Sequence, residues 1–125
     1  EDIPLALPGL ISQSDCISML TDNTVVQHLN LVLDQTDAAG LPVYGSEVEQ
    51  VKNGCVAAVG IDYLALGRKT GLIAVRVLQG EEADSIPFEV LSDFDLFYNH
   101  EALTRMGLSV PEELLPLLNE VSDSL

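Results

Sequence analysis

Three short apolar runs mark the first half of the chain, at residues 16–20, 41–45 and 55–61. None alternates cleanly between apolar and polar positions, as expected of strands that are buried on both faces. Two longer stretches, 24–39 and 63–79, repeat apolar side chains at helical spacing and end at Gly40 and Gly80. The alternation of strand-like and helix-like segments along the chain predicts an α/β fold with a doubly wound, mainly parallel sheet and helices on both faces.

The remaining segments are less regular. Residues 5–11 resemble a helix fragment, and residues 88–90 and 94–98 resemble extended pieces. Asn99 or His100 is expected to start a short helix that ends near residue 107. Pro111 is placed as the first residue of a last helix, because proline suits that position and two acidic residues follow it.

Composition narrows the class of protein. The chain has 125 residues, 47% of them hydrophobic, which suits one domain with a buried core. Its 20 acidic and 5 basic residues give a net charge of −15, which argues against nucleic acid or an anionic membrane as a partner. No apolar run approaches the ~18 residues of a membrane span. Because the sequence begins with Glu1, we expect a mature product or an excised piece.

Polar clusters follow each predicted strand. They are Thr21-Asp22-Asn23-Thr24, Ser46-Glu47 and Asp62. Ligands of open parallel sheets bind beyond the carboxyl ends of the strands, so these clusters are the candidate site for a small polar molecule. The helix that starts after Asn23 also offers backbone N–H groups that suit a carboxylate. A second interpretation is that Asp22 and Asp62 only cap helices and that Glu47 is a solvated loop acid.

The sequence contains no sign of catalysis. It has no Gly-x-Ser-x-Gly elbow, no glycine-rich phosphate loop and no His-Glu-x-x-His motif. His28 and His100 lie far in sequence from both cysteines, whose spacing matches no zinc pattern. We therefore predict neither an enzyme, nor a cofactor, nor a metal site.

Two interpretations of Cys16 and Cys55 remain open. If the first and third strands were neighbours, the two residues would lie level and within reach of a disulfide. The favoured alternative is a pair of reduced, buried thiols, because side-by-side strand geometry rarely suits the bond.

Several spaced motifs together resemble one family. They are TDNTV (21–25), GLPVYGSE (40–47), NGCVAAVGIDY (53–63), LGR (66–68), IP (86–87) and MGLSVPEEL (106–114). This series resembles the ABC-transporter substrate-binding proteins, a family that includes tryptophan- and other aromatic-amino-acid-binding lipoproteins. The resemblance covers nearly the whole chain.

The resemblance implies a fold and a role. Members have the two-lobed type I periplasmic-binding fold, and residues 1–125 resemble the C-terminal lobe alone. The expected partners are therefore a missing N-terminal lobe, a small solute such as an amino acid, and an ABC permease. The expected location is periplasmic or extracellular and membrane-anchored, and the expected mechanism is closure of two lobes on the solute followed by its handover.

The resemblance also implies site residues. Thr21, Asp22, Asn23, Thr24, Ser46, Glu47 and Asp62 match the cleft-facing motifs of the family. On this assignment Asn23 and Thr24 hold a solute carboxylate, while Asp22, Glu47 and Asp62 meet an ammonium or hydroxyl group. Tyr44 and Tyr63 are weaker candidates for stacking, and core packing is preferred for both.

Two other functions compete with solute uptake. The same lobe architecture serves as the ligand-sensing domain of transcription regulators and signalling proteins. A receiver-like phosphoacceptor domain is disfavoured, because the acidic pair it needs after the first strand is replaced by Asp22-Asn23 and no lysine follows residue 69.

Overall fold

The computed structural model describes residues 2–90 and 94–121. The chain forms two compact units. The first unit is Glu1–Gly60 with Asp95–Leu125, and the second is Ile61–Phe94. The second unit holds the helix α5 (Tyr63–Leu78) and the short 3-10 helix η1 (Ala83–Ser85).

The first unit holds a five-stranded sheet and its helices. In chain order its elements are α1 (Ile3–Ile11), β1 (Ile17–Ser18), α2 (Asn23–Gln27), α3 (Leu29–Ala39), β2 (Val43–Gly45), α4 (Val48–Lys52), β3 (Ala57–Gly60), β4 (Asp95–Asn99), α6 (His100–Arg105), η2 (Leu115–Leu117) and β5 (Leu118–Val121). The strands lie in the order β1-β2-β3-β4-β5. The β3–β4 pairing is antiparallel and the other three are parallel, so the predicted α/β fold with a mainly parallel sheet is confirmed.

This strand order corrects one sequence-based assumption. The first strand pairs with the second, and β2 separates β1 from β3. Cys16 is therefore not level with Cys55 on a neighbouring strand. Both cysteines are free thiols, and only Cys55 is buried.

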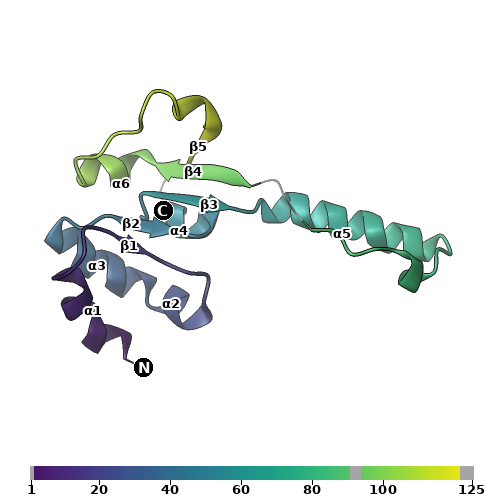
Figure 1. Ribbon diagram of the computed structural model, residues 1–125, viewed down its shortest axis with the longest axis horizontal. Coiled ribbons are helices and arrows are strands. Elements are labelled where there is room, and N and C mark those ends of the chain that lie inside the picture. The colour runs from purple at the N-terminus through teal and green to yellow at the C-terminus, as the bar shows by residue number, and fades with distance from the viewer. Residues whose placement is uncertain (1, 91–93, 122–125) are drawn as a thin grey trace. The chain divides into compact units, whose positions relative to one another are not determined.

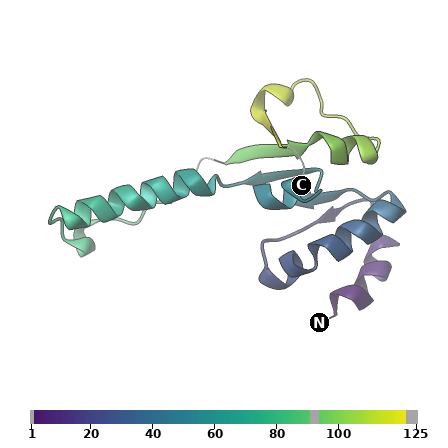
Figure 2. The ribbon, with the colours of Figure 1, turned by 180° about the vertical axis from the view of Figure 1, so that it is seen from behind.

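One face of the sheet carries the main core. Ile17, Val43 and Ala58 point to this face, where they pack with Leu7 of α1, with apolar side chains of α3, and with Val51 of α4. Figures 1 and 2 show α1, α2 and α3 gathered beside β1, on the side away from β4. The alternating positions of the strands form a second face.

The second face is only partly covered. A smaller cluster joins Tyr98 of β4 to Ala102 and Leu103 of α6. The register Ser18–Tyr44–Ala57–Tyr98 places these residues in one row across four strands. Tyr44 is 39% exposed, so the preference for core packing of this tyrosine was wrong.

The predicted helices are present, with different boundaries. The single helix expected over 24–39 is broken at His28, which ends α2 and precedes α3. As predicted, α3 stops at Gly40, whose φ of 66° lies in the left-handed region that glycine tolerates without a Cβ clash. The helix predicted over 63–79 is α5, which ends at Leu78, and the fragment predicted over 5–11 is part of the longer helix α1.

The prediction for the last segment was wrong. Residues 112–114 form turns, and η2 follows in place of an α-helix that starts at Pro111. Pro116 disfavours a continuous α-helix here, because a proline inside a helix removes one backbone hydrogen bond and clashes with the preceding turn. The chain then enters β5, which the sequence reading missed. Of the two extended pieces, 94–98 corresponds to β4, whereas residues 88–90 form no strand.

Candidate functional site

The first two polar clusters meet at the carboxyl ends of β1 and β2. Because these strands are parallel neighbours, their ends emerge at the same edge of the sheet. The Oγ1 atom of Thr21 lies 2.7 Å from the Oγ atom of Ser46, within hydrogen-bond distance. We call this place, formed by residues 21–24 and 46–47, the polar corner.

Asp22 is the N-cap of α2. Its Oδ1 atom accepts the backbone N–H of Thr24 at 2.8 Å and that of Val25 at 3.2 Å. The capping interpretation is therefore confirmed, and Asp22 already accepts the backbone N–H of Thr24. That Asn23 and Thr24 hold a solute carboxylate stays a prediction. The Oδ2 atom makes no hydrogen bond within the described part of the chain. Asn23 and Thr24 are exposed residues of the first turn of α2.

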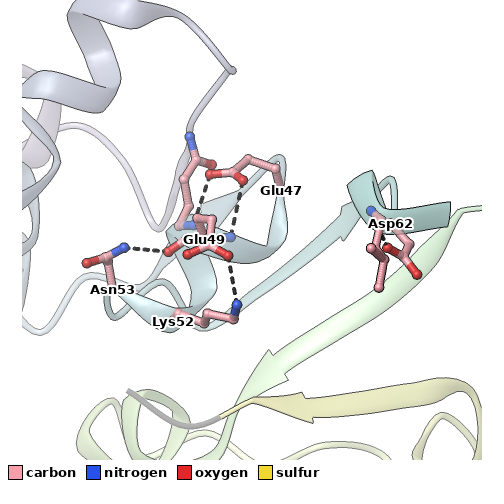
Figure 3. A network of polar contacts seen from close by, with 7 residues as sticks. Glu47, Glu49, Lys52, Asn53 and Asp62 are labelled. Carbon is pink, nitrogen blue, oxygen red and sulfur yellow. Dashed lines mark hydrogen bonds and ion pairs between the residues drawn. The ribbon is translucent and has the colours of Figure 1, made fainter. Parts of the chain in front are cut away.

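Glu47 is buried, which corrects its interpretation as a solvated loop acid. It is 9% exposed and caps α4: Oε1 accepts the N–H of Gln50 at 3.0 Å and Oε2 accepts that of Glu49 at 3.1 Å. Figure 3 shows its carboxylate folded over the first turn of α4. Gly60 makes this approach possible, since a Cβ atom built there would lie 3.1 Å from the Cα atom of Glu47.

Gln50 is a site residue that sequence reasoning missed. This residue of α4 is 1% exposed, and its Oε1 atom accepts the backbone N–H of Ser46 at 2.7 Å. The Glu47-x-x-Gln50 spacing is that of an N-cap residue and a Gln at the third helical position, so the capping-box pattern was the available signal. It was missed because the N-cap here is Glu rather than Ser or Thr.

Cys55 lies behind the same turn. Burial, and secondarily the negative charge of Glu47, raise the pKa of its thiol from 9.0 to about 12. Thiolates are the reactive form of cysteine, so Cys55 is inert at neutral pH. Cys16 is exposed, so only one of the two cysteines fits the expectation of a buried thiol.

Asp62 and Tyr63 belong to the second unit. The Oδ1 atom of Asp62 accepts the N–H groups of Leu64 at 2.8 Å and Ala65 at 3.1 Å, so Asp62 caps α5 (Figure 3). Tyr63 is 54% exposed, so core packing was also wrong for this tyrosine. That Asp62 contributes to the same site as the polar corner stays a prediction.

Cations are absent from the polar corner among the residues that the structure describes. The first unit contains two of the five basic residues, Lys52 and Arg105. Lys52 pairs with Glu49 at 2.7 Å (Figure 3), and Arg105 pairs with Asp37 at 2.8 Å. His28 is engaged through Nδ1 with the carbonyl of Thr24 at 2.7 Å. The side chains of the corner therefore present carboxylates and hydroxyl groups, together with the exposed amide of Asn23.

Two apolar hollows adjoin the corner within the first unit. One, of about 500 Å³, begins at Ser46 and Leu20 and extends over Tyr44, Val59 and Leu96. The other, of about 510 Å³, lies between α1 and β1 and includes Asp22. Neither was evident in the sequence, because their walls come from strands and helices that are distant along the chain.

Two negative findings concern the described residues 2–90 and 94–121. No helix there is long and apolar enough to cross a bilayer. No group of three or more His, Cys, Asp or Glu side chains is placed there to hold a metal ion.

Comparison with known proteins gives consistent matches. The family model described as ABC transporter substrate binding protein matches residues 1–122. The tyrosine-binding protein of Clostridioides difficile (strain R20291) is 29% identical over 108 residues, and an uncharacterised protein of Rickettsia prowazekii (strain Madrid E) is 28% identical over 114. These matches cover 86% and 91% of this chain but only 31% and 38% of the relatives.

Solved structures share the fold. The ABC domain in complex with L-Trp from Streptococcus pneumonia has a TM-score of 0.83 at 28% identity, over 96% of this chain and 42% of that chain. The ligand-free, open substrate-binding protein with adhesive properties from Clostridium difficile has a TM-score of 0.78 at 28% identity, over 98% of this chain and 41% of that chain. The family match over residues 1–122 shows that this chain belongs to the ABC transporter substrate-binding proteins.

Proposed function

We propose that this chain is the C-terminal lobe of a two-lobed protein that binds an amino acid and delivers it to an ABC permease. Tryptophan and tyrosine are the first candidates, because one relative is a tyrosine-binding protein and one similar structure holds L-Trp. The ligand-binding residues in this proposal are Thr21, Asp22, Asn23, Thr24, Ser46, Glu47 and Asp62.

The observation that carries the proposal is the meeting of Thr21 and Ser46 at 2.7 Å, at the ends of two parallel strands. Hydroxyl groups and carboxylates that converge at such an edge suit a small polar solute. Asp22 keeps one carboxylate oxygen unbonded after it has capped its helix, so capping and solute binding are compatible.

The partners follow from the family and from the length of the match. The chain spans about two fifths or less of its relatives and structural neighbours, which leaves room for an N-terminal lobe in the full-length protein. We place the full protein outside the cytoplasm, where a solute-binding protein meets its permease. Closure of two lobes on the solute is the expected motion.

The first test is a thermal-shift screen of the full-length protein against the common L-amino acids, followed by calorimetry. A ligand that binds only the folded state raises Tm, and the expected hits include tryptophan or tyrosine. Absence of a shift with every amino acid would contradict the proposed solute class.

Substitutions then test the residues. Asp22→Ala and Asp62→Ala should each weaken binding by about tenfold, since a charge-assisted hydrogen bond contributes about 1.5–3 kcal/mol. Asp22→Asn keeps an acceptor for the α2 cap and separates loss of charge from loss of the cap. Asp34→Ala is the matched control, because Asp34 is an exposed acid on α3. Unchanged affinity in both Asp→Ala variants would show that these residues only cap helices.

A further inference from the structure

Gln50, a buried residue of α4, bonds to the polar corner and sets the orientation of its hydroxyl groups. Its Oε1 atom lies 2.7 Å from the backbone nitrogen of Ser46 and 3.4 Å from Ser46 Oγ, which in turn lies 2.7 Å from Thr21 Oγ1. The reverse orientation of the amide would set two donors, Nε2–H and the Ser46 N–H, against each other. The carbonyl oxygen of Gln50 therefore faces Ser46.

This orientation sets the direction of the hydrogen bonds. An amide oxygen carries no hydrogen, so in the contact with Gln50 the Ser46 hydroxyl is the donor. Thr21 is then the donor in the short contact with Ser46. The chain Thr21→Ser46→Gln50 gives both hydroxyl hydrogens an acceptor within the protein, and successive hydrogen bonds in one direction strengthen one another. Both hydroxyl hydrogens then point inward, and the hydroxyl oxygens offer lone pairs outward.

The acids of the corner add further acceptors. Asp22 has one unbonded carboxylate oxygen, and the buried carboxylate of Glu47 is bonded to backbone N–H groups alone within the described chain. The two cations of the first unit are paired with Glu49 and Asp37. The corner thus lacks a side-chain donor for a ligand, apart from the amide of Asn23.

Gln50 also carries an unfavourable feature. Its Nε2 group is buried and has no hydrogen-bond partner in the part of the chain that the structure describes. An unsatisfied buried donor lowers stability, so an apolar side chain of similar volume would suit packing better. This cost is understandable if the carbonyl oxygen has a role in binding.

We infer that Gln50 is a positioning residue that holds the Ser46 and Thr21 hydroxyls as acceptors, so that the corner selects a solute with a protonated amine. The inference rests on the proposed function and names the group of the solute that this lobe recognises. A free ammonium group offers three donors and no acceptor, which matches a corner of lone pairs and negative charge.

The test compares two ligands that differ only in the amine. L-tryptophan and 3-(indol-3-yl)propanoate are titrated calorimetrically into the full-length protein, and the ratio of their Kd values measures selection for the amine. Gln50→Met keeps the volume but removes the acceptor, so the Ser46 hydrogen is free to turn outward. We expect the ratio to fall by about tenfold, the effect of one hydrogen bond to a charged group. Gln50→Glu keeps an acceptor oxygen at Ser46 and adds negative charge, which also favours an ammonium, so its ratio should not fall.

The possible outcomes separate the inference from the proposed function. A Gln50→Met variant that weakens both ligands by the same factor, with an unchanged ratio, overturns the inference and leaves the solute-binding function intact. A wild-type protein that binds no amino acid overturns the proposed solute class itself. If Gln50→Met fails to fold, Ser46→Ala interrupts the same chain of hydroxyls, and a ratio unchanged in that variant also refutes the inference.

Discussion

Gly60 provides a sharp test of how the sheet supports the polar corner. A Cβ atom at this position would lie 3.1 Å from the Cα atom of Glu47 and 3.4 Å from the carbonyl oxygen of Ser46. Both neighbours are backbone atoms, so no side-chain rotation relieves the contact. Gly60→Ala therefore has to push the end of β3 away from the turn that carries Ser46 and Glu47.

The expected loss of stability is about 1–3 kcal/mol, the usual cost of one extra carbon atom in a well-packed interior. Gly60 is not among the glycines with positive φ, so backbone strain adds nothing to this estimate. Because the displaced turn carries Ser46 and Glu47, solute affinity in the full-length protein should fall as well.

Gly9→Ala is the matched control, because the same methyl group is added where it has room. Gly9 lies inside α1, and no atom outside its immediate surroundings is within 4 Å of the added Cβ. Alanine favours a helix interior by about 0.5–1 kcal/mol over glycine, so this variant should be more stable.

Urea denaturation followed by circular dichroism measures both variants. We expect midpoints that move in opposite directions at similar m-values. A Gly60→Ala protein as stable as the wild type would refute the argument that β3 and the Ser46–Glu47 turn are in close contact.

Two further predictions concern buried groups. Asn99→Ala removes the N-cap of α6 and the hydrogen bond from Nδ2 to the carbonyl of Val51, so it should lower the free energy of unfolding by about 2–4 kcal/mol in urea denaturation. The control Asn53→Ala, at an exposed position, should cost less than about 0.5 kcal/mol. Equal effects would contradict the role of burial. The raised pKa of Cys55 means that, above pH 9, the folded state keeps a proton that the unfolded state loses. The free energy of unfolding should therefore be unaffected below pH 9, and well above pH 9 it should fall by about 1.4 kcal/mol per pH unit until the pH reaches the folded pKa of about 12. Between pH 8 and pH 10 the wild type should therefore lose about 1.4 kcal/mol more stability than Cys55→Ala, and equal losses would refute the assignment.

Local sequence patterns were sufficient for most elements of the fold. Apolar runs located β1 to β3, and helical spacing with Gly40 as a stop located α3, because both signals depend on residues close together in the chain. The capping of α2 by Asp22 and of α5 by Asp62 was also predicted, since a cap bonds to residues two and three positions ahead. The break at His28 and the effect of Pro116 were equally local, and they were overlooked.

Strand order and burial depended on contacts between distant parts of the chain. The pairing of β1 with β2 decided that Thr21 meets Ser46 and that Cys16 does not meet Cys55. The acidity of Glu47 suggested exposure, but the approach of Gly60 from β3 and the first turn of α4 enclose its side chain.

The sequence by itself determined the approximate positions of β1 to β3, α3 and α5, the caps at Asp22 and Asp62, and which family the chain resembles. Only the tertiary structure decided which strand ends are neighbours, that Glu47 and Gln50 are buried, and that Gln50 faces Ser46. The physical reason is that periodicity and capping act within a few residues. Strand pairing and enclosure depend instead on free-energy differences summed over contacts between residues far apart in sequence, which no short pattern records.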